Sequence, residues 1–328
     1  KTEKRVMFMK IAGIVAEYNP FHNGHAHHIQ QTRALDGGCE ATHVVAVMSG
    51  NFVQRGEPAL LPKIKRAEMA LKGGVDLVLE LPLPWCLASA EGFAFGAVSL
   101  LNSLGCVDVL SFGSECGDIT ALEKAADTLE SPRFSQLLHY YLEGGRPFAE
   151  ARQKAAAEIG GTKVASLFSQ ANNTLGIEYI KAIRRLQSPM ACFTIPRFGA
   201  GHDALSPIGD MASASYIRAL LQADHLLNAT AYLPPASTAL LSEAIQAGCC
   251  PASVSHMERA LLGGLRTLTK EAWGRLSGVS EGLENRLYTA ARQADSYENL
   301  LELVKTKRYP LTRLQRTIWS AYLGIPGG

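Results

Sequence analysis

The sequence predicts an α/β protein built on a doubly wound, Rossmann-like parallel sheet. Short runs rich in Val, Ile and Leu recur without polar alternation, which is typical of strands covered on both faces. Segments with helical spacing of apolar residues separate these runs, and this alternation favours a parallel sheet. A sheet of this kind binds its ligand at the carboxyl ends of its strands.

The expected elements follow one another closely in the first third of the chain. Strands are predicted at residues 11–16, 44–48, 75–81 and 107–112. Helices are predicted around residues 64–71 and 93–104. Gly73, Gly74 and Gly105 are suited to end these helices, because glycine readily adopts the left-handed conformation of a helix C-terminus.

The rest of the chain is predicted to be mainly helical. Residues from about 118 to 187 are expected to form a helical insertion, after which a strand at residues 190–196 would deliver Arg197 to the carboxyl end of the sheet. Leu233-Pro234-Pro235 is predicted as a linker. We therefore expect a sheet domain over residues 10–230 and a C-terminal α-helical domain over residues 231–328.

Composition limits the class of protein to which this chain can belong. The 328 residues are 47% hydrophobic, enough to bury a large core, and the net charge of +2 means that any RNA-binding surface must be local. No apolar run reaches the roughly 18 residues that cross a bilayer, and the first residues lack a signal-type apolar segment. These features predict a cytoplasmic protein.

Cysteine and histidine usage predicts reduced thiols and no metal site. The seven cysteines are odd in number and scattered, and none forms a Cys-x-x-Cys pair. His22, His25, His27 and His28 cluster in the sequence, but no cysteine or carboxylate at ligand spacing accompanies them.

The most informative motif is YNPFHNGH at residues 18–25, directly after the first predicted strand. A turn from a strand into a helix exposes backbone N–H groups that bind phosphate. Gly24 lets a triphosphate approach the backbone, and His22 and His25 lie three residues apart, so both can face it and stabilise charge on a phosphorus centre. The alternative is that two histidines fell at this spacing by chance.

A second phosphate-binding signal is MASASYIR at residues 211–218. Ser213 is the expected N-cap of a helix that runs from Ser215 to about Ala223, and Arg218 lies one turn in. The alternative is an ordinary capped helix with a solvated arginine. Together the two motifs resemble the signatures of the HIGH-type nucleotidyltransferase superfamily, and by this resemblance Ser213, Ser215 and Arg218 would bind the nucleotide.

Longer motifs resemble those of one family within this superfamily. The sequence resembles the bacterial tRNA-Met cytidine acetate ligase family at residues 17–25 (EYNPFHNGH), 48–58 (MSGNFVQRGEP), 80–82 (ELP), 112–115 (FGSE), 172–179 (NNTLGIEY), 197–201 (RFGAG) and 305–309 (KTKRY). The family usually continues past the point at which this chain stops, at Gly328.

The resemblance implies an activity and a site. Such enzymes form acetyl-adenylate from ATP and acetate, release pyrophosphate, and acetylate N4 of the wobble cytidine of elongator tRNA-Met. The implied cofactors are ATP and Mg²⁺ and the implied partners are tRNA and acetate, with no membrane and no DNA. The implied ATP site comprises Ile14, Val15, Ala16, Glu17, Tyr18, Asn19, Pro20, Phe21, His22, Asn23, Gly24, His25, Ala26, His27, Gly113, Asn172 and Arg197.

Several residues invite a physical interpretation beside the resemblance. Arg55 follows the second strand in a glycine-rich turn, where its guanidinium could reach phosphate oxygens, although a surface-loop arginine is the alternative. Lys63, Lys65 and Arg66 begin a helix, a position where cations oppose the macrodipole, so an anionic partner is predicted. Gly113 offers bare backbone to a base or ribose.

Asn172 or Asn173 could hydrogen-bond the adenine edge or the ribose. For Asn173, a role as helix N-cap is an equally good interpretation.

The basic cluster near the C-terminus predicts RNA contacts. Lys305, Lys307, Arg308, Arg313 and Arg316 fall within twelve residues with no acid among them, and Tyr309 could stack on a base. The alternative is a solvated charged face.

Two other functions stay open at this point. A metabolite adenylyltransferase would use the nucleotide site without RNA. A non-catalytic RNA-binding protein with a vestigial nucleotide pocket is less consistent with an intact His22, Gly24 and His25.

Overall fold

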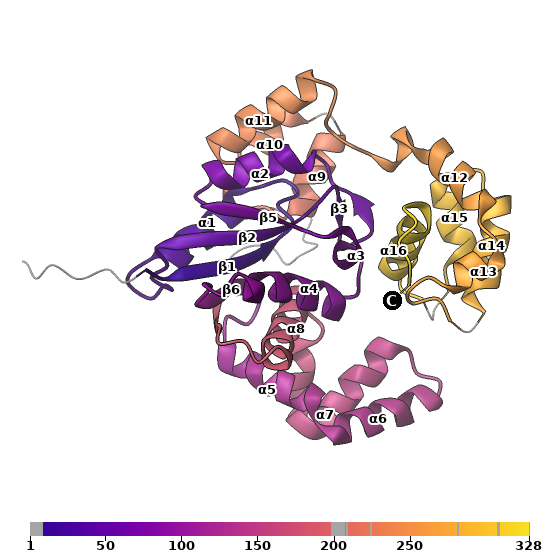
Figure 1. The fold of residues 1–328 in the computed structure, drawn as a ribbon, viewed down its shortest axis with the longest axis horizontal. Coiled ribbons are helices and arrows are strands. Elements are labelled where there is room, and N and C mark those ends of the chain that lie inside the picture. Colours follow the sequence, from indigo (N-terminus) through magenta and orange to yellow (C-terminus); the bar gives the residue numbers. More distant parts are fainter. Residues whose placement is uncertain are drawn as a thin grey trace, which may run out of the picture.

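The computed structural model describes residues 9–197, 207, 209–223, 225–280, 282–306 and 309–327. Its centre is a parallel five-stranded sheet in the order β5-β2-β1-β6-β7 (Figure 1). The strands are β1 (Ile11–Ala16), β2 (His43–Ser49), β5 (Leu77–Leu81), β6 (Val109–Ser114) and β7 (Ala191–Pro196). The predicted doubly wound parallel sheet is confirmed, because each of these strands overlaps a predicted apolar run and all pair in parallel.

Helices cover both faces of the sheet because the strands are apolar on both sides. One face packs against α4 (Ala90–Ser103), α5 (Ile119–Glu130) and α8 (Ala171–Arg185). The other packs against α1 (Asn23–Arg33), α2 (Lys63–Lys72), α9 (Ala214–Gln222), α10 (Leu226–Thr230) and α11 (Pro235–Gln246). Figure 1 shows these layers below and above the sheet.

A short hairpin and a short helix follow two strands of the sheet. β3 (Phe52–Val53) and β4 (Glu57–Pro58) form an antiparallel hairpin after β2, and α3 (Leu83–Cys86) follows β5. The hairpin was not predicted. Its strands are two residues long, too short for any periodicity in the sequence to indicate them.

The helical insertion is present as predicted. It comprises α5, α6 (Pro132–Glu143), α7 (Phe148–Leu167) and α8. Helices α6 and α7 pack against each other through a small core of their own that includes Phe134, Ala155 and Ala165.

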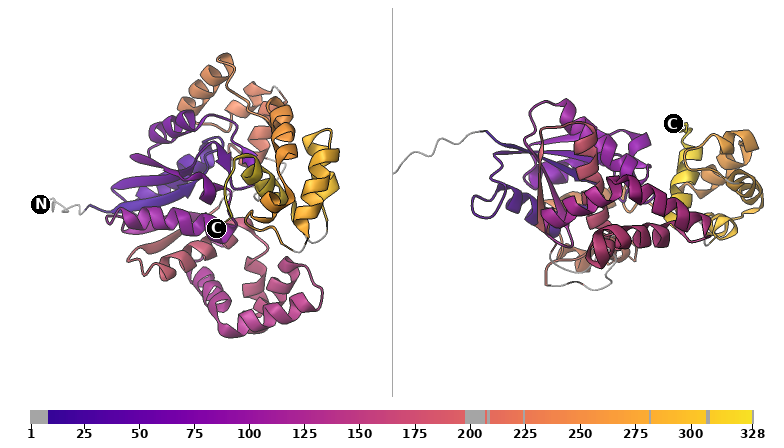
Figure 2. Two further views of the ribbon diagram at one scale, coloured as in Figure 1. Left: turned by 45° about the vertical axis from the view of Figure 1, so that its right-hand side comes forward. Right: turned by 90° about the horizontal axis from the view of Figure 1, so that it is seen from below.

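A second helical unit ends the described chain. It contains a 3-10 turn (Val254–His256) and the helices α12 (Glu258–Thr267), α13 (Lys270–Gly274), α14 (Leu283–Gln293), α15 (Tyr297–Val304) and α16 (Leu311–Tyr322). The buried Trp273 and Trp319 belong to its core. Figure 2 shows the unit, orange to yellow, beside the sheet unit.

The structure corrects the predicted linker and the domain boundary near residue 231. Pro234 is the N-cap of α11 and Pro235 its first residue, positions that proline fits because no helical N–H is lost there. Leu240, Leu241 and Cys250 belong to the core of the sheet unit, so that unit extends to about residue 250.

Among the described residues, no helix has the length and apolar character needed to cross a bilayer. The seven cysteines are all free thiols.

Candidate active site

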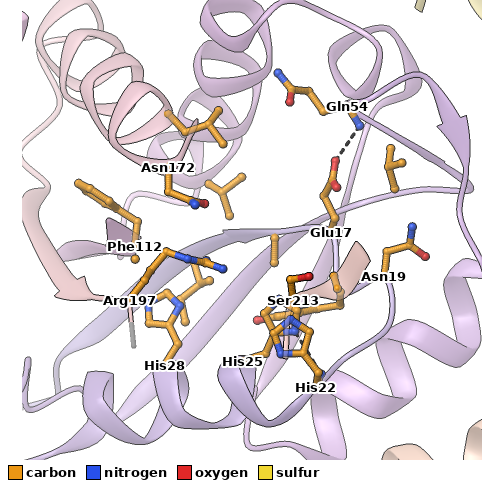
Figure 3. Close-up of a pocket in the computed structure, with 18 of the residues that line it drawn as sticks. Glu17, Asn19, His22, His25, His28, Gln54, Phe112, Asn172, Arg197 and Ser213 are labelled. Atoms are coloured by element: carbon orange, nitrogen blue, oxygen red, sulfur yellow. Dashed lines mark hydrogen bonds between the residues drawn. The ribbon is translucent and has the colours of Figure 1, made fainter. Parts of the chain in front are cut away.

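A cleft opens where the order of the strands reverses. β1 lies in the middle of the sheet, the chain winds outward from it to β2 and β5 on one side and to β6 and β7 on the other, and ligands bind at such a switch point. The cleft lies at the carboxyl ends of β1 and β6 (Figure 3). Its lining includes these predicted residues: Ile14, Val15, Ala16, Glu17, Tyr18, Asn19, His22, His25, Arg55, Gly113, Asn172, Arg197, Ser213, Ser215 and Arg218.

The turn into α1 fixes both histidine rings. His22 is the N-cap: its Nδ1 accepts the Gly24 N–H at 3.1 Å, and the His25 Nδ1 accepts the His22 N–H at 3.2 Å. The rings stack with centroids 3.7 Å apart. A Cβ on Gly24 would lie 2.9 Å from the His22 ring, so this turn requires glycine for space.

These contacts determine the protonation of the pair. Burial, followed by Arg197 and Arg218, lowers the pKa of His22 to about 3, and burial with His22, Arg197 and His28 holds the pKa of His25 well below its usual value. Both rings are therefore neutral near pH 7. Since each Nδ1 accepts a backbone N–H, each proton is on Nε2, and the pair supplies two neutral donors to the cleft.

His28 also lines the cleft and was not predicted as a site residue. Its Nε2 lies 3.0 Å from the Ser111 Oγ of β6, and burial lowers its pKa to about 4. Its place one turn after His25 is the signal in the sequence that could have indicated it.

Glu17 brings a carboxylate into the cleft. Its Oε1 accepts the backbone N–H of Gln54 at 2.6 Å, which ties the end of β1 to the hairpin (Figure 3). Burial raises the pKa of Glu17 above its ordinary value, opposed by this hydrogen bond and by Arg218, Arg66 and Arg55. The nearby Gln54 lines the cleft as well and was not predicted.

The N-terminus of α9 faces the same cleft, and the predicted helix is confirmed there. Ser213 caps it by accepting the Tyr216 N–H at 3.1 Å. Arg218 donates to the Asn19 carbonyl oxygen at 3.1 Å and to the Ser215 Oγ at 3.3 Å. Two motifs almost 200 residues apart in the sequence thus meet, which concentrates positive potential beside the histidine turn.

The opposite wall comes from β6, β7 and α8. A Cβ on Gly113 would lie 3.1 Å from Cγ of Arg197, so the absence of a side chain lets Arg197 lie against the strand. Asn172 opens onto the cleft and is held by Glu115, which accepts its backbone N–H at 3.1 Å and its side-chain N–H at 2.7 Å. Glu115 was not predicted as a site residue.

The N-cap interpretation of Asn173 is wrong. Asn173 is fully buried within α8, whose N-cap is Gln170. Its Oδ1 accepts the Cys116 N–H, and its Nδ2 donates to Gln170, so its side chain holds the loop after β6 rather than a ligand.

Some residues of the predicted ATP stretch support the turn instead of lining the cleft. Phe21 is fully buried beneath Gly73, and Ala26 packs against the core beneath α1. Asn23 donates its side-chain N–H to two carbonyl oxygens, of Asp210 and Ala231. Pro20 is not part of the lining either, whereas Gly24 and His27 line an adjoining cavity that shares His22, His25 and Arg197 with the cleft.

The predicted anionic partners of the cations at the start of α2 are present for Lys63 and Lys65, but they are carboxylates of the protein itself, and Arg66 has carbonyl partners instead. Lys63 bonds to Glu80 and Lys65 to Glu243. Arg66 is fully buried and donates to the carbonyl oxygens of Glu17 and Gly50. Tertiary contacts thus offset the unfavourable position that the sequence indicated.

The predicted basic cluster is divided between different environments. Lys307 and Arg308 lie outside the described residues, and Lys305 is exposed. Tyr309 is buried and donates its hydroxyl to the Ser280 carbonyl oxygen, which contradicts a role in base stacking. Arg313 donates to the Gly278 carbonyl oxygen and lies over the Tyr309 ring.

Arg316 is partly buried against the hairpin rather than directed into solvent. Its Nη1 donates to the carbonyl oxygen of Gln54 at 3.4 Å. We therefore assign it to the contact between α16 and the hairpin, not to an RNA surface.

A comparison with protein families matches residues 9–327 to the HIGH Nucleotidyl Transferase model. A tRNA(Met) cytidine acetate ligase of Caldanaerobacter subterraneus subsp. tengcongensis is 40% identical over 320 residues, which is 97% of this chain and 79% of the relative. The enzyme of that name from Caldicellulosiruptor saccharolyticus is 44% identical over 318 residues, with 94% and 76% covered.

Solved structures are also similar to this chain. Thermotoga maritima TmcAL in its apo form I superposes with a TM-score of 0.91 at 38% identity and covers 97% of this chain and 76% of its own. TmcAL bound with alpha-thio ATP superposes with a TM-score of 0.89 at 37% identity and the same coverage. This chain belongs to the HIGH nucleotidyl transferase family and, within it, to the tRNA(Met) cytidine acetate ligases.

Proposed function

We propose that the protein is an ATP-dependent ligase that activates acetate as acetyl-adenylate and transfers the acetyl group to N4 of the wobble cytidine of elongator tRNA-Met. The observation that carries this proposal is the cleft at the switch point, where the histidine turn, Arg197 and the start of α9 converge. Support comes from relatives about 40% identical over nearly the whole chain that bear this name. A compartment that supplies tRNA and ATP, the cytoplasm, is part of the proposal.

In the first step an acetate oxygen attacks the α-phosphorus of ATP and pyrophosphate leaves. The Nε2–H donors of His22 and His25 are oriented before the substrate arrives, so they can stabilise the charge that grows on the phosphoryl oxygens. Arg197, Arg218 and Arg55 supply positive charge to the triphosphate. Asn172, with its amide N–H already bonded to Glu115, keeps its oxygen as an acceptor for the adenosine.

Mg²⁺ belongs to the proposal as a companion of the triphosphate. Among the described residues no group of three or more His, Cys, Asp or Glu side chains could hold a metal ion, and the cleft lining has one carboxylate, Glu17. The ion would thus be held mainly by phosphate oxygens and water. It would neutralise phosphate charge, and we derive no step through it.

In the second step the cytidine amine displaces AMP from the acetyl group. The helical unit formed by α12 to α16 packs through α16 on the hairpin beside the cleft, so it is suited to present a nucleotide there. Lys305, Lys307 and Arg308 remain the proposed phosphate contacts to tRNA.

The test is incubation with ATP, labelled acetate and total bacterial tRNA, followed by digestion to nucleosides. We expect label in N4-acetylcytidine from tRNA-Met, with AMP and pyrophosphate as products, and no label when ATP is omitted. Label in a small nucleotide product without tRNA would instead support a metabolite adenylyltransferase.

A further inference from the structure

We propose that Glu17 is the general base of acetyl transfer, which accepts the proton that the cytidine amine loses as N4 attacks the acetyl carbonyl. This inference rests on the proposed function and assigns a residue to its second step. Three observations support it. The Glu17 carboxylate lines the cleft, and the other possible proton acceptors there are already hydrogen-bonded or protonated. The hairpin that holds Glu17 also contacts the C-terminal unit.

A bond forms between N4 and the carbonyl carbon, the bond from that carbon to the adenylate oxygen breaks, and AMP leaves with the electron pair. The nitrogen must lose one proton to become a neutral amide. A carboxylate in hydrogen-bond reach of the amine can accept this proton and later release it to water.

The other titratable groups in the cleft are poorer acceptors. The Nδ1 atoms of His22 and His25 already accept backbone N–H groups, so these rings have no free lone pair. His28 is hydrogen-bonded to Ser111. Burial raises the pKa of the Tyr18 and Tyr179 hydroxyls, so both stay protonated near pH 7 and neither can take up a proton.

Glu17 is the carboxylate of the described cleft lining. Its Oε1 accepts the Gln54 N–H at 2.6 Å, and this contact orients the side chain at the end of β1. Figure 3 shows the carboxylate on the side of the cleft toward Gln54, above His22 and His25. Glu17, His22 and His25 line the same cleft.

The hairpin that holds Glu17 also contacts the C-terminal unit. Arg316 donates to the carbonyl oxygen of Gln54, and Phe52 packs on Trp319 with ring centroids 5.0 Å apart. Glu17 therefore lies on the side of the cleft from which a nucleotide carried by that unit would enter. This places the base beside the incoming amine rather than beside the departing pyrophosphate.

The groups around Glu17 leave its pKa raised, which suits a general base. Arg218 of α9, Arg66 of α2 and Arg55 of the hairpin each favour the carboxylate, whereas burial disfavours it and prevails, so its pKa lies above the ordinary value. Tyr179 of α8 and Cys86 of α3 also face it, and its negative charge favours the neutral form of both. A base with a raised pKa accepts a proton more readily than an ordinary carboxylate does.

The experiment separates the two steps in the full chain. Glu17→Gln keeps an oxygen to accept the Gln54 N–H but removes the base. Acetate-dependent exchange of labelled pyrophosphate into ATP reports the first step. Single-turnover transfer from synthetic acetyl-adenylate to tRNA reports the second. Glu243→Gln, which removes the carboxylate of a surface ion pair with Lys65, is the matched control.

We expect Glu17→Gln to retain exchange within about threefold and to lower transfer by about 10²-fold or more, with the control unchanged in both. Wild-type transfer should rise with pH through an apparent pKa above that of an ordinary carboxyl group, and this limb should be absent in the variant. Equal losses in both steps would overturn the proposal and assign Glu17 to the nucleotide or its Mg²⁺.

Unchanged transfer in the variant would also overturn it. If the variant fails to fold, the wild-type profile decides, because transfer that is independent of pH between 4.5 and 8 would exclude this base. Failure of the wild-type enzyme in exchange is a different result, and it would contradict the proposed function instead.

Discussion

His22 and His25 show how a short motif becomes a defined pair of donors. The sequence predicted that both face a phosphate, because they lie three residues apart after a strand. It could not predict their protonation, which depends on burial and on the backbone N–H groups that each Nδ1 accepts. Gln54 and Glu115 escaped prediction for a related reason: they act through contacts 37 and 57 positions away in the chain.

The lowered pKa values of the cleft histidines predict that acid destabilises the fold. The pKa of His28 is about 4 in the folded protein, compared with about 6.5 in an unfolded chain. Between these values the unfolded state binds more protons, so the free energy of unfolding falls as the pH falls from about 6.5 to about 4. Each such histidine contributes at most about 1.4 kcal/mol per pH unit.

Urea unfolding at pH 7 and pH 5 measures this loss. We expect wild type to lose more stability between the two values than His28→Gln does, because the variant lacks one titrating group. Equal losses in the two proteins would contradict the lowered pKa described for His28.

At the scale of elements, the sequence predicts what depends on periodicity and fails where tertiary contacts decide. The five strands of the sheet follow from apolar runs. Pro234 and Pro235 looked like a linker, yet proline is equally suited to begin a helix, and only the packing of α11 against α2 distinguishes the two. The carboxylates that bond to Lys63 and Lys65 lie on β5 and α11, so tertiary contacts also decide these ion pairs.

We predict that substitution of Gly56, in the hairpin, is unusually destabilising. Its φ of +80° strains any other residue, and a Cβ there would lie 2.5 Å from the backbone N of Arg316. Gly145 has a φ of +78° with no atom within 4 Å of its Cβ position, so it is a matched control for the strain alone. We expect Gly145→Ala to cost about 1 kcal/mol and Gly56→Ala clearly more.

Urea unfolding measures both costs, and transfer from acetyl-adenylate to tRNA tests the functional consequence. Gly56→Ala should slow transfer because it displaces α16 from the hairpin, while Gly145→Ala should not. Similar stabilities for the two variants would mean that α16 does not pack on the hairpin as described.

At the scale of the whole molecule, the C-terminal unit packs on the hairpin that borders the cleft of the sheet unit. The sheet unit supplies the cleft, and the C-terminal unit reaches it through α16 and the hairpin. The sequence predicted both units, and it assigned the five cations of residues 305–316 in the C-terminal unit to one RNA surface. The folded chain separates them, because Arg313 and Arg316 bond to carbonyl oxygens within the protein.

The remaining cations predict a salt-dependent tRNA contact. Changing Lys305, Lys307 and Arg308 to Ala should weaken tRNA binding, and each lost phosphate contact should lower the slope of log affinity against log salt by about 0.7 to 0.9. Acetyl-adenylate formation should persist. Arg313→Ala is the contrasting control, expected to reduce stability without changing the slope. An unchanged slope in the triple variant would make this cluster a solvated face.

The most direct test of the central claim, that the histidine turn activates acetate on ATP, is acetate-dependent pyrophosphate exchange by His25→Ala. Loss of a donor oriented in advance should lower the rate by about 10²-fold or more in a variant whose circular dichroism matches wild type. His43→Ala, at an exposed histidine on β2, should exchange at the wild-type rate. Wild-type exchange by a folded His25→Ala variant would contradict the account.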